Sequence, residues 1–163
     1  LAWEPKSGLV FGGSGNFGGG GTRPSEKEAK FFAFDPGARK VVWEAALVAG
    51  AQRYPATAAA EGRVFAAVGD RLLVLDPAAF AVTATLTLPG AAVEIALGPD
   101  GYGRLVGLTG RGVYVVDPVE NRVVHTASAP VPVNCGFAVV DHAVYFGSGA
   151  TLWRYRLPPP ASR

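Results

Sequence analysis

The chain has few charged residues and one cysteine, and each scarcity excludes a class of protein. Charged residues make up 17% of the 163 residues, and 15 basic against 13 acidic side chains leave a net charge of +2. So small a net charge gives no broad basic field, which argues against a nucleic-acid partner. The single cysteine, Cys135, excludes an internal disulfide and a metal site built from several cysteines. No apolar run approaches the length of a membrane span, so we expect none.

Methionine is absent, and the sequence begins at Leu1 within what looks like a folded segment. We therefore interpret the chain as a piece of a longer protein, in which any signal peptide would lie upstream. Glycine and proline are plentiful, at 22 and 13 residues. Their abundance excludes a coiled coil, and the lack of a Gly-X-Y period excludes collagen. A hydrophobic fraction of 49% argues against disorder.

Two landmarks recur along the chain with one spacing. An apolar run that ends in Asp-Pro occurs three times, with its aspartates at Asp35, Asp76 and Asp117, 41 residues apart. A second apolar run precedes each Asp-Pro pair and occurs a fourth time. These second runs lie at residues 8–11, 62–65, 103–106 and 143–146. The first copy carries an insertion of about a dozen residues between the two landmarks. A period of this length indicates a repeat architecture.

Each copy contains short apolar or alternating runs separated by turn residues. In the second copy Val82, Ala84 and Leu86 alternate with threonines, which is the period of a half-buried strand. No segment of ten or more residues has a convincing helical stripe. We expect strands at residues 2–4, 9–13, 31–34 and 41–46; at 55–60, 64–68, 72–75 and 81–88; at 93–97, 105–108, 113–116 and 122–127; and at 136–140, 144–146 and 152–155. Four strands in about 41 residues, repeated, are typical of a β-propeller blade.

The segment from Lys30 to Glu44, KFFAFDPGARKVVWE, resembles the repeat of quinoprotein-like (PQQ-like) propellers. That family's repeat has an apolar strand, Asp, a Gly-containing turn, a basic residue, two apolar residues and Trp, here Trp43. The second and third copies resemble the looser YVTN-type propeller repeat and lack the Trp. The resemblance covers nearly the whole chain and implies a β-propeller. Both families include enzymes, assembly factors and binding modules, so the resemblance implies no single function.

The expected fold is therefore all-β, a β-propeller of about four four-stranded blades at residues 1–47, 54–88, 92–128 and 134–157. A proline-rich tail follows at residues 158–163. The last blade lacks its fourth strand, because residues 157–160 read Leu-Pro-Pro-Pro and cannot continue a hydrogen-bonded strand. This pattern suggests the C-terminal part of a ring of about seven or eight blades. Its partner in closing the ring is either the remainder of the propeller or a second copy of the chain. A self-contained ring of four blades is the less favoured alternative.

The repeated aspartates are expected to be structural. Each precedes a proline in the turn between the third and fourth strands, where an aspartate side chain accepts hydrogen bonds from backbone N–H groups. The glycine-rich stretch at residues 12–22 lacks the Gly-Lys-Ser/Thr ending and the following helix of a phosphate-binding loop. We interpret it as an insertion between two strands.

Candidate ligand-binding residues lie in the loops that join the second strand to the third and one blade to the next. In propellers these loops surround the mouth of the central channel, where ligands commonly bind. They contain Asn16 and Phe17 in the insertion, and Arg53, Tyr54, Glu94 and Asn134 in the inter-blade loops. Arg53 with Tyr54 suits an anionic or sugar-like ligand, through fork hydrogen bonds and ring stacking. The plain alternatives are a solvated insertion, a Tyr54 packed between blades and an Arg53 in solvent.

Other reactive residue types give no site. Cys135 is expected to be a small buried residue rather than a nucleophile, because neither His125 nor His142 is placed to act as its base. Two histidines on separate elements do not predict a metal site. We assign no catalytic residue, no metal and no cofactor.

The sequence favours a non-catalytic propeller domain that binds a carbohydrate or protein ligand on its loop-bearing face. We expect it within a larger secreted or envelope protein, and therefore in an extracellular or periplasmic location. The alternative is the C-terminal half of a propeller enzyme, such as a glycan-active lyase or hydrolase or a lactonase-like enzyme; a quinone-dependent dehydrogenase is a weaker third interpretation. An enzyme predicts that Arg53, Tyr54, Glu94 and Asn134 converge at the channel mouth. A scaffold predicts that Ala58, Ala96 and Ala138 line the channel instead.

Overall fold

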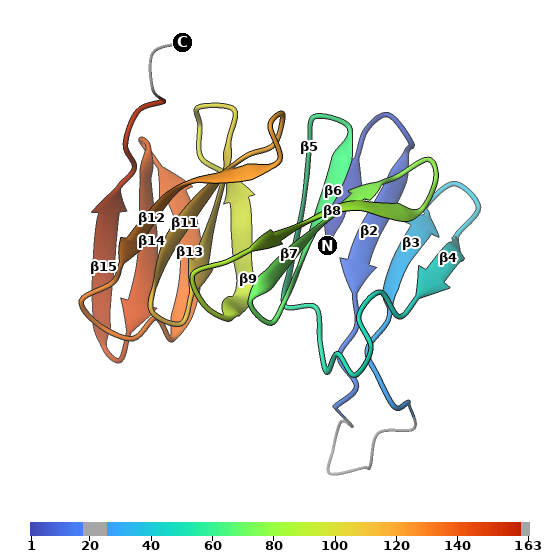
Figure 1. The fold of residues 1–163 in the computed structure, drawn as a ribbon, viewed down its shortest axis with the longest axis horizontal. Helices are drawn as coiled ribbons and strands as arrows, with labels where there is room; N and C mark the ends of the chain where they lie inside the picture. The colour runs from blue at the N-terminus through green and yellow to red at the C-terminus, as the bar shows by residue number, and fades with distance from the viewer. Residues whose placement is uncertain (18–25, 161–163) are drawn as a thin grey trace.

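The computed structural model describes residues 1–17 and 26–160, except for the side chains of residues 94 and 95, and every regular element within these ranges is a β-strand. Four antiparallel sheets are each built from strands that are consecutive in the chain (Figure 1). Sheet 1 contains β1 (Ala2–Glu4), β2 (Leu9–Gly13), β3 (Phe31–Asp35) and β4 (Lys40–Ala45); sheet 2 contains β5 (Ala56–Ala60), β6 (Arg63–Val68), β7 (Arg71–Asp76) and β8 (Ala81–Thr87). Sheet 3 contains β9 (Ala92–Pro99), β10 (Leu105–Thr109), β11 (Gly112–Asp117) and β12 (Arg122–Ser128); sheet 4 contains β13 (Cys135–Val140), β14 (Ala143–Ser148) and β15 (Thr151–Arg156).

The structure confirms the all-β class and the repeated sheets. The predicted strands differ from the observed ones by at most two residues at either end. Sheet 4 has three strands, as the prolines after β15 predict. None of the described residues forms a helix that is long and apolar enough to cross a membrane.

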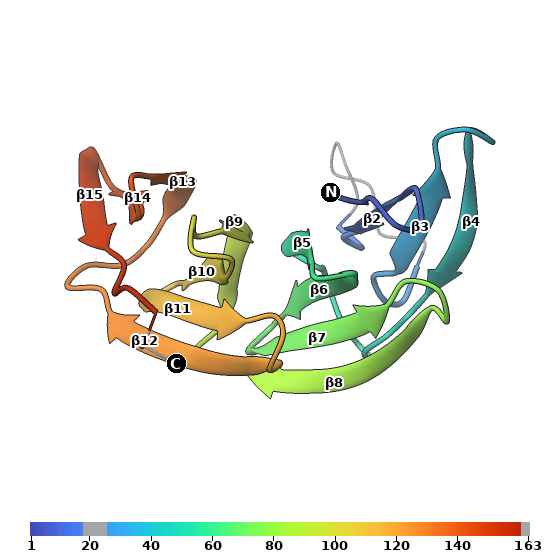
Figure 2. The same cartoon turned by 90° about the horizontal axis from the view of Figure 1, so that it is seen from above.

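The four sheets stand side by side along an open arc (Figure 2). Their first strands lie on the inside, where β5 contacts both β1 and β9, and β9 contacts β13. The strands β4, β8 and β12 lie on the outside of the arc. Each sheet therefore has a forward face, toward the next sheet in the chain, and a rear face, toward the preceding one.

Apolar side chains fill the three spaces between neighbouring sheets. Phe11 and Phe31 of sheet 1 pack on Val64 and Leu73 of sheet 2. Phe65, Leu72 and Val74 of sheet 2 pack on Leu105 and Tyr114 of sheet 3. Val106, Val113 and Val115 of sheet 3 pack on Val144 and Phe146 of sheet 4. Because strand residues alternate between the two faces, sheets 2 and 3 bury both of their faces.

The two ends of the arc are uncovered. On the rear face of sheet 1, Trp3 is 53% exposed, and on the forward face of sheet 4, Leu152 is 72% exposed. Leu72 and Val113 occupy the position equivalent to Leu152 in sheets 2 and 3, and both are buried. The same repeat position is therefore core where another sheet follows and surface where none does.

The repeated aspartates form the predicted turns. Asp35 Oδ1 accepts a hydrogen bond from the amide of Ala38 at 2.9 Å. Asp76 Oδ1 accepts one from Ala78 at 2.8 Å, and Asp117 Oδ1 accepts one from Val119 at 2.9 Å. The structural interpretation of these carboxylates is therefore confirmed.

Two arginines at equivalent repeat positions fasten one sheet to the next. Arg63 Nη1 donates to the carbonyl oxygen of Pro118 at 2.6 Å, in the turn after β11. Arg104 Nη2 donates to the carbonyl oxygen of Pro158 at 2.7 Å, in the segment after β15, and Arg104 Nε donates to Asp100 Oδ2 at 2.6 Å. Asp100 is fully buried. A Gly-Arg pair at residues 62–63 and again at 103–104 thus forms an inter-sheet link close to where β6 and β10 begin.

We expect Arg104→Met to lower the free energy of unfolding by roughly 3 kcal/mol, because it leaves the buried Asp100 carboxylate without its cation. Arg122→Met, at an exposed position on the neighbouring β12, is the matched control and should change stability little. Denaturant unfolding of both variants measures the difference. Equal stabilities would contradict a fastening role for Arg104.

One aromatic residue in the core needs a glycine beside it. A side chain at Gly107 would collide with the ring of Tyr114, which is fully buried between sheets 2 and 3. The Tyr114 hydroxyl has no hydrogen-bond partner among the described residues. Burial raises the pKa of Tyr114 above its ordinary value of 10.0.

Tyr114→Phe should therefore leave the free energy of unfolding unchanged or higher at neutral pH, because it removes an unpaired buried hydroxyl. A raised pKa in the folded state gives stability that is present below pH 10 and is lost as the pH rises further. The decline of stability above pH 10 should be shallower in Tyr114→Phe than in the parent protein. Denaturant titrations from pH 7 to about 11 test this, with the part-exposed Tyr145→Phe as control. A lower stability of Tyr114→Phe at pH 7 would show that the hydroxyl has a partner.

Candidate functional site

The base of the insertion in sheet 1 is tied to the loop between β4 and β5. Gly15 and Arg53 form an isolated antiparallel bridge. The backbone hydrogen bonds between these segments are Asn16 N to Gln52 O at 2.9 Å, Tyr54 N to Ser14 O at 3.2 Å and Ala29 N to Ala51 O at 2.7 Å. Both ends of the insertion, as far as the structure describes them, are therefore hydrogen-bonded to the loop that joins sheets 1 and 2.

This anchoring places both Phe17 and Arg53 beside Gly15. A Cβ atom at Gly15 would lie 3.6 Å from the Phe17 ring and 3.7 Å from Arg53 Cβ. Phe17 is 67% exposed and Arg53 is exposed. Asn16 lies between Gly15 and Phe17 in sequence, and its side-chain amide donates to the Lys27 carbonyl oxygen at 3.3 Å. We call Asn16, Phe17 and Arg53 the Phe17–Arg53 patch.

A cavity of about 410 Å³ continues from the patch along the same face of the molecule. Its lining comes from residues 48–53, 55, 68–71, 91 and 92. Arg53 belongs to both the patch and the cavity, and Asp70 and Arg71 add two further charges to the lining. An exposed ring, two guanidinium groups and polar backbone thus lie together at sheets 1 and 2.

Tyr54 lies in the core beneath this face. It is 5% exposed, and its ring contacts Phe31 edge-on with centroids 5.5 Å apart. Its hydroxyl accepts hydrogen bonds from the amides of Leu47 at 3.0 Å and Val48 at 3.3 Å. Burial raises the pKa of Tyr54, and the two amides act in the opposite direction. Tyr54 therefore shapes the loop from below, and Phe17 is the aromatic side chain that reaches solvent beside Arg53.

Of the other predicted ligand residues, Asn134 does not join the patch. Asn134 belongs to the loop before β13 in sheet 4, and its Oδ1 accepts a hydrogen bond from the amide of Gly149 at 3.2 Å. The backbone of Glu94 lies in β9, and its side chain is outside the described residues. Of the alanines expected along the inner strands, Ala58 and Ala96 are buried, and Ala138 is exposed on the uncovered sheet 4.

The expectation that Cys135 is buried is wrong. Its thiol is free and exposed, because β13 belongs to the sheet that no further sheet covers. His125 Nε2 lies 2.8 Å from the Tyr155 hydroxyl, and the His142 ring stacks on Tyr102 at 3.7 Å, so both histidines contact other side chains. Within residues 1–17 and 26–160, no group of three His, Cys, Asp or Glu residues is arranged to hold a metal ion.

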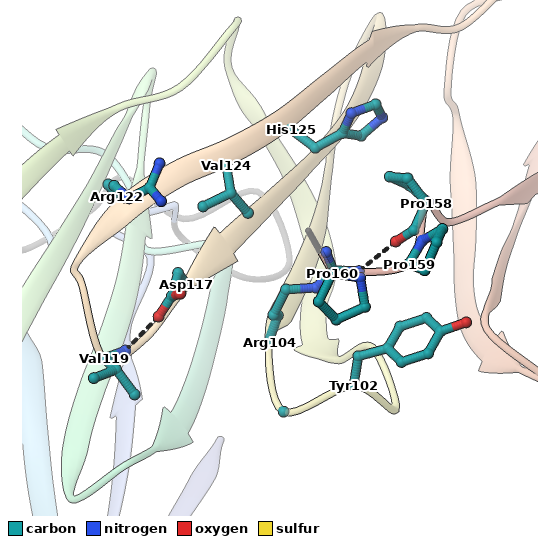
Figure 3. Close-up of a pocket in the computed structure, with 11 residues that line it drawn as sticks. Tyr102, Arg104, Asp117, Val119, Arg122, Val124, His125, Pro158, Pro159 and Pro160 are labelled. Carbon is teal, nitrogen blue, oxygen red and sulfur yellow. Dashed lines mark hydrogen bonds between the residues drawn. The ribbon is translucent and has the colours of Figure 1, made fainter. Parts of the chain in front are cut away.

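A larger cavity of about 750 Å³ lies on the opposite face, between sheet 3 and the proline segment that follows β15. Figure 3 shows Arg122, Val124 and His125 along one strand and the three prolines of the tail across from them. A cavity of about 370 Å³ occupies the equivalent place between sheets 2 and 3. Gly62, Arg63, Asp76, Thr83 and Asn121 line the smaller cavity, and the equivalent Gly103, Arg104, Asp117, Val124 and Pro160 line the larger one. The two cavities therefore occupy equivalent positions of the repeat. The larger one lies next to sheet 4, which has three strands instead of four.

Comparison with known proteins gives a fold and no family. No family model and no curated protein matches the sequence. Among solved structures, the chain is similar to hydrazine synthase from Kuenenia stuttgartiensis, with a TM-score of 0.55 and 15% sequence identity. The similarity covers 79% of this chain and 35% of that chain, so the chain spans about a third of its length. An identity this low shows a shared arrangement of sheets alone.

Proposed function

We propose that the chain forms four consecutive blades of a β-propeller of the quinoprotein-like or YVTN type and acts as a non-catalytic binding module. The 41-residue repeat, the inner-to-outer strand order and the fanned sheets support this fold. The exposure of Trp3 and Leu152 supports a ring that further blades complete, because Leu72 and Val113, the residues equivalent to Leu152 in sheets 2 and 3, are buried by the next sheet. These blades are the remainder of the propeller, and we place the whole protein outside the cytoplasm.

The Phe17–Arg53 patch is the proposed binding site, and a carbohydrate that carries a carboxylate is its proposed ligand. The exposed Phe17 ring suits the C–H face of a sugar, and the Arg53 guanidinium suits a carboxylate through paired hydrogen bonds. Gln52 is exposed next to them, and its amide suits sugar hydroxyls. The observation that carries the proposal is the bridge between Gly15 and Arg53, because it holds ring and cation together without a ligand.

We expect Phe17→Ala to weaken binding of acidic and neutral oligosaccharides alike by about tenfold, because it removes the stacking surface. Arg53→Ala should weaken binding of uronic-acid oligosaccharides by about tenfold and leave neutral ones nearly unchanged, because it removes the charge-assisted pair. A glycan microarray followed by calorimetry on the best acidic and neutral binders measures both effects.

Two variants on other surfaces serve as matched controls. Val119→Ala removes an exposed apolar side chain from the turn after β11, and Lys40→Ala removes an exposed cation from β4. Neither should change the affinity. Binding that is indifferent to both Phe17→Ala and Arg53→Ala, or that Lys40→Ala weakens equally, would overturn the proposed site.

A further inference from the structure

The cavity beside the Phe17–Arg53 patch is formed by a loop that is longer than its counterparts. The segments that join one sheet to the next span residues 46–55, 88–91 and 129–134, so the one between sheets 1 and 2 is the longest. That loop lines the cavity of about 410 Å³ together with the β6–β7 turn and the β8–β9 loop. The cavity therefore lies among sheets 1, 2 and 3, which all have four strands.

The long loop is held in place by its own hydrogen bonds. The Tyr54 hydroxyl accepts hydrogen bonds from two of its backbone amides. The amide of Gly50 donates to Glu28 Oε2 at 2.8 Å, and the Gly50 carbonyl oxygen accepts a hydrogen bond from Gln52 Nε2 at 3.1 Å. Because ordering a loop on binding costs free energy, a loop that is fixed beforehand favours a ligand.

Small residues line the cavity and leave its space open. Ala51, Val68 and Ala92 are buried and give the lining an apolar part, which suits the C–H groups of a sugar ring. Ala91 also lines the cavity and is exposed. Small-molecule sites have volumes of about 300 to 1,000 Å³, so the space is large enough for a ring beyond the one that stacks on Phe17.

The cation Arg71 in this lining is not a residue that the repeat requires. It begins β7 after a two-residue turn, and Gly112 and Thr151 hold the same position in β11 and β15. Arg71 is exposed and forms no ion pair with any residue that the structure describes. Its guanidinium group is therefore available to a ligand carboxylate, which it can bind through paired hydrogen bonds.

Asp70 narrows the class of anion that fits this cavity. Its carboxylate accepts hydrogen bonds and donates none, so it suits sugar hydroxyls. Arg53 and Arg71 against Asp70 give the lining a net charge of +1. A ring with one carboxylate and several hydroxyls satisfies both signs of charge. A dense polyanion without hydroxyl donors, such as tripolyphosphate, would be repelled by Asp70.

We propose that the ligand of the Phe17–Arg53 patch is an oligouronate of at least two rings, whose second ring occupies the cavity with its carboxylate on Arg71. This inference rests on the proposed carbohydrate-binding function and adds a chain length and a second acidic subsite to it. The first ring stacks on Phe17 and binds Arg53 through its carboxylate. Asp70 accepts hydrogen bonds from the hydroxyls of the second ring.

Affinity should rise from one ring to two and then level off. The probes are mannuronate and galacturonate, each as the monomer, the dimer and the tetramer. Ligand-observed NMR detects weak binding and measures their dissociation constants. The dimers should bind about tenfold more tightly than the monomers, because the second carboxylate gains a charge-assisted pair. The tetramers should add little beyond the dimers.

Two variants remove the second subsite by different means. Arg71→Ala should abolish most of the gain from monomer to dimer and leave the affinity for the monomer unchanged. Ala91→Leu should do the same by filling the cavity from an exposed position. The matched controls are Arg111→Ala, at an exposed arginine in the equivalent turn of sheet 3, and Ala79→Leu, at an exposed alanine in the turn after β7. Neither control should change any of the affinities.

The outcomes separate this inference from the proposed function. No binding in either series, or binding that is indifferent to Phe17→Ala and Arg53→Ala, would overturn both. Monomers and dimers that bind equally, or a gain that persists in Arg71→Ala, would overturn the second subsite and leave the patch in place. Tripolyphosphate that displaces a dimer as effectively as the tetramer does would also overturn it, because charge alone would then explain the binding.

Discussion

The structure depends on the need of every sheet to cover two apolar faces. A strand places alternate residues on opposite faces, so a sheet whose strands are apolar throughout is stable only between two neighbours. Strands β6, β7, β10 and β11 satisfy this condition and are buried almost completely. Strands β13 and β15 alternate between half-buried and exposed residues, because sheet 3 covers one face and no sheet that the structure describes covers the other. An open arc of four sheets therefore leaves two sheet faces uncovered among the described residues, the rear face of sheet 1 and the forward face of sheet 4.

Strand positions could be predicted from the sequence because turn chemistry is local. Asp-Pro pairs and Gly-Arg pairs mark the ends of strands wherever they stand, and the carboxylates of Asp35, Asp76 and Asp117 act within their own turns. Burial could not be predicted equally well, because it depends on which sheet faces which. Tyr54 lies under the loop that was expected to display it, and Cys135 is exposed because its sheet is the last. Phe17 and Arg53 meet through a bridge between segments that are far apart in the sequence.

The two faces of the arc differ in how their loops are built. On one face, Arg63 and Arg104 repeat a single contact between neighbouring sheets, so the turns there are occupied in holding the arc together. The sequence signal for this role is the Gly-Arg pair at two equivalent positions. The arginine of this pair is replaced by Leu9 in sheet 1 and by Ala143 in sheet 4. On the other face, the insertion in sheet 1 has no counterpart in the other repeats, and its ends are fixed to a neighbouring loop. The insertion occurs in one sheet only and is held by its own hydrogen bonds. It is therefore better suited to binding a ligand than the turns at Arg63 and Arg104, which hold neighbouring sheets together.

The departures of sheet 4 from the repeat support one another. Arg156 in place of aspartate removes the turn acceptor, and Pro160 in place of a residue with positive φ forbids the turn itself. Arg154 in place of valine makes the face unfit for a purely apolar cover. Each change alone would weaken an ordinary four-stranded sheet. Together they exclude the hairpin turn by which the other three sheets add a fourth strand, and they place two arginines on the exposed face of sheet 4.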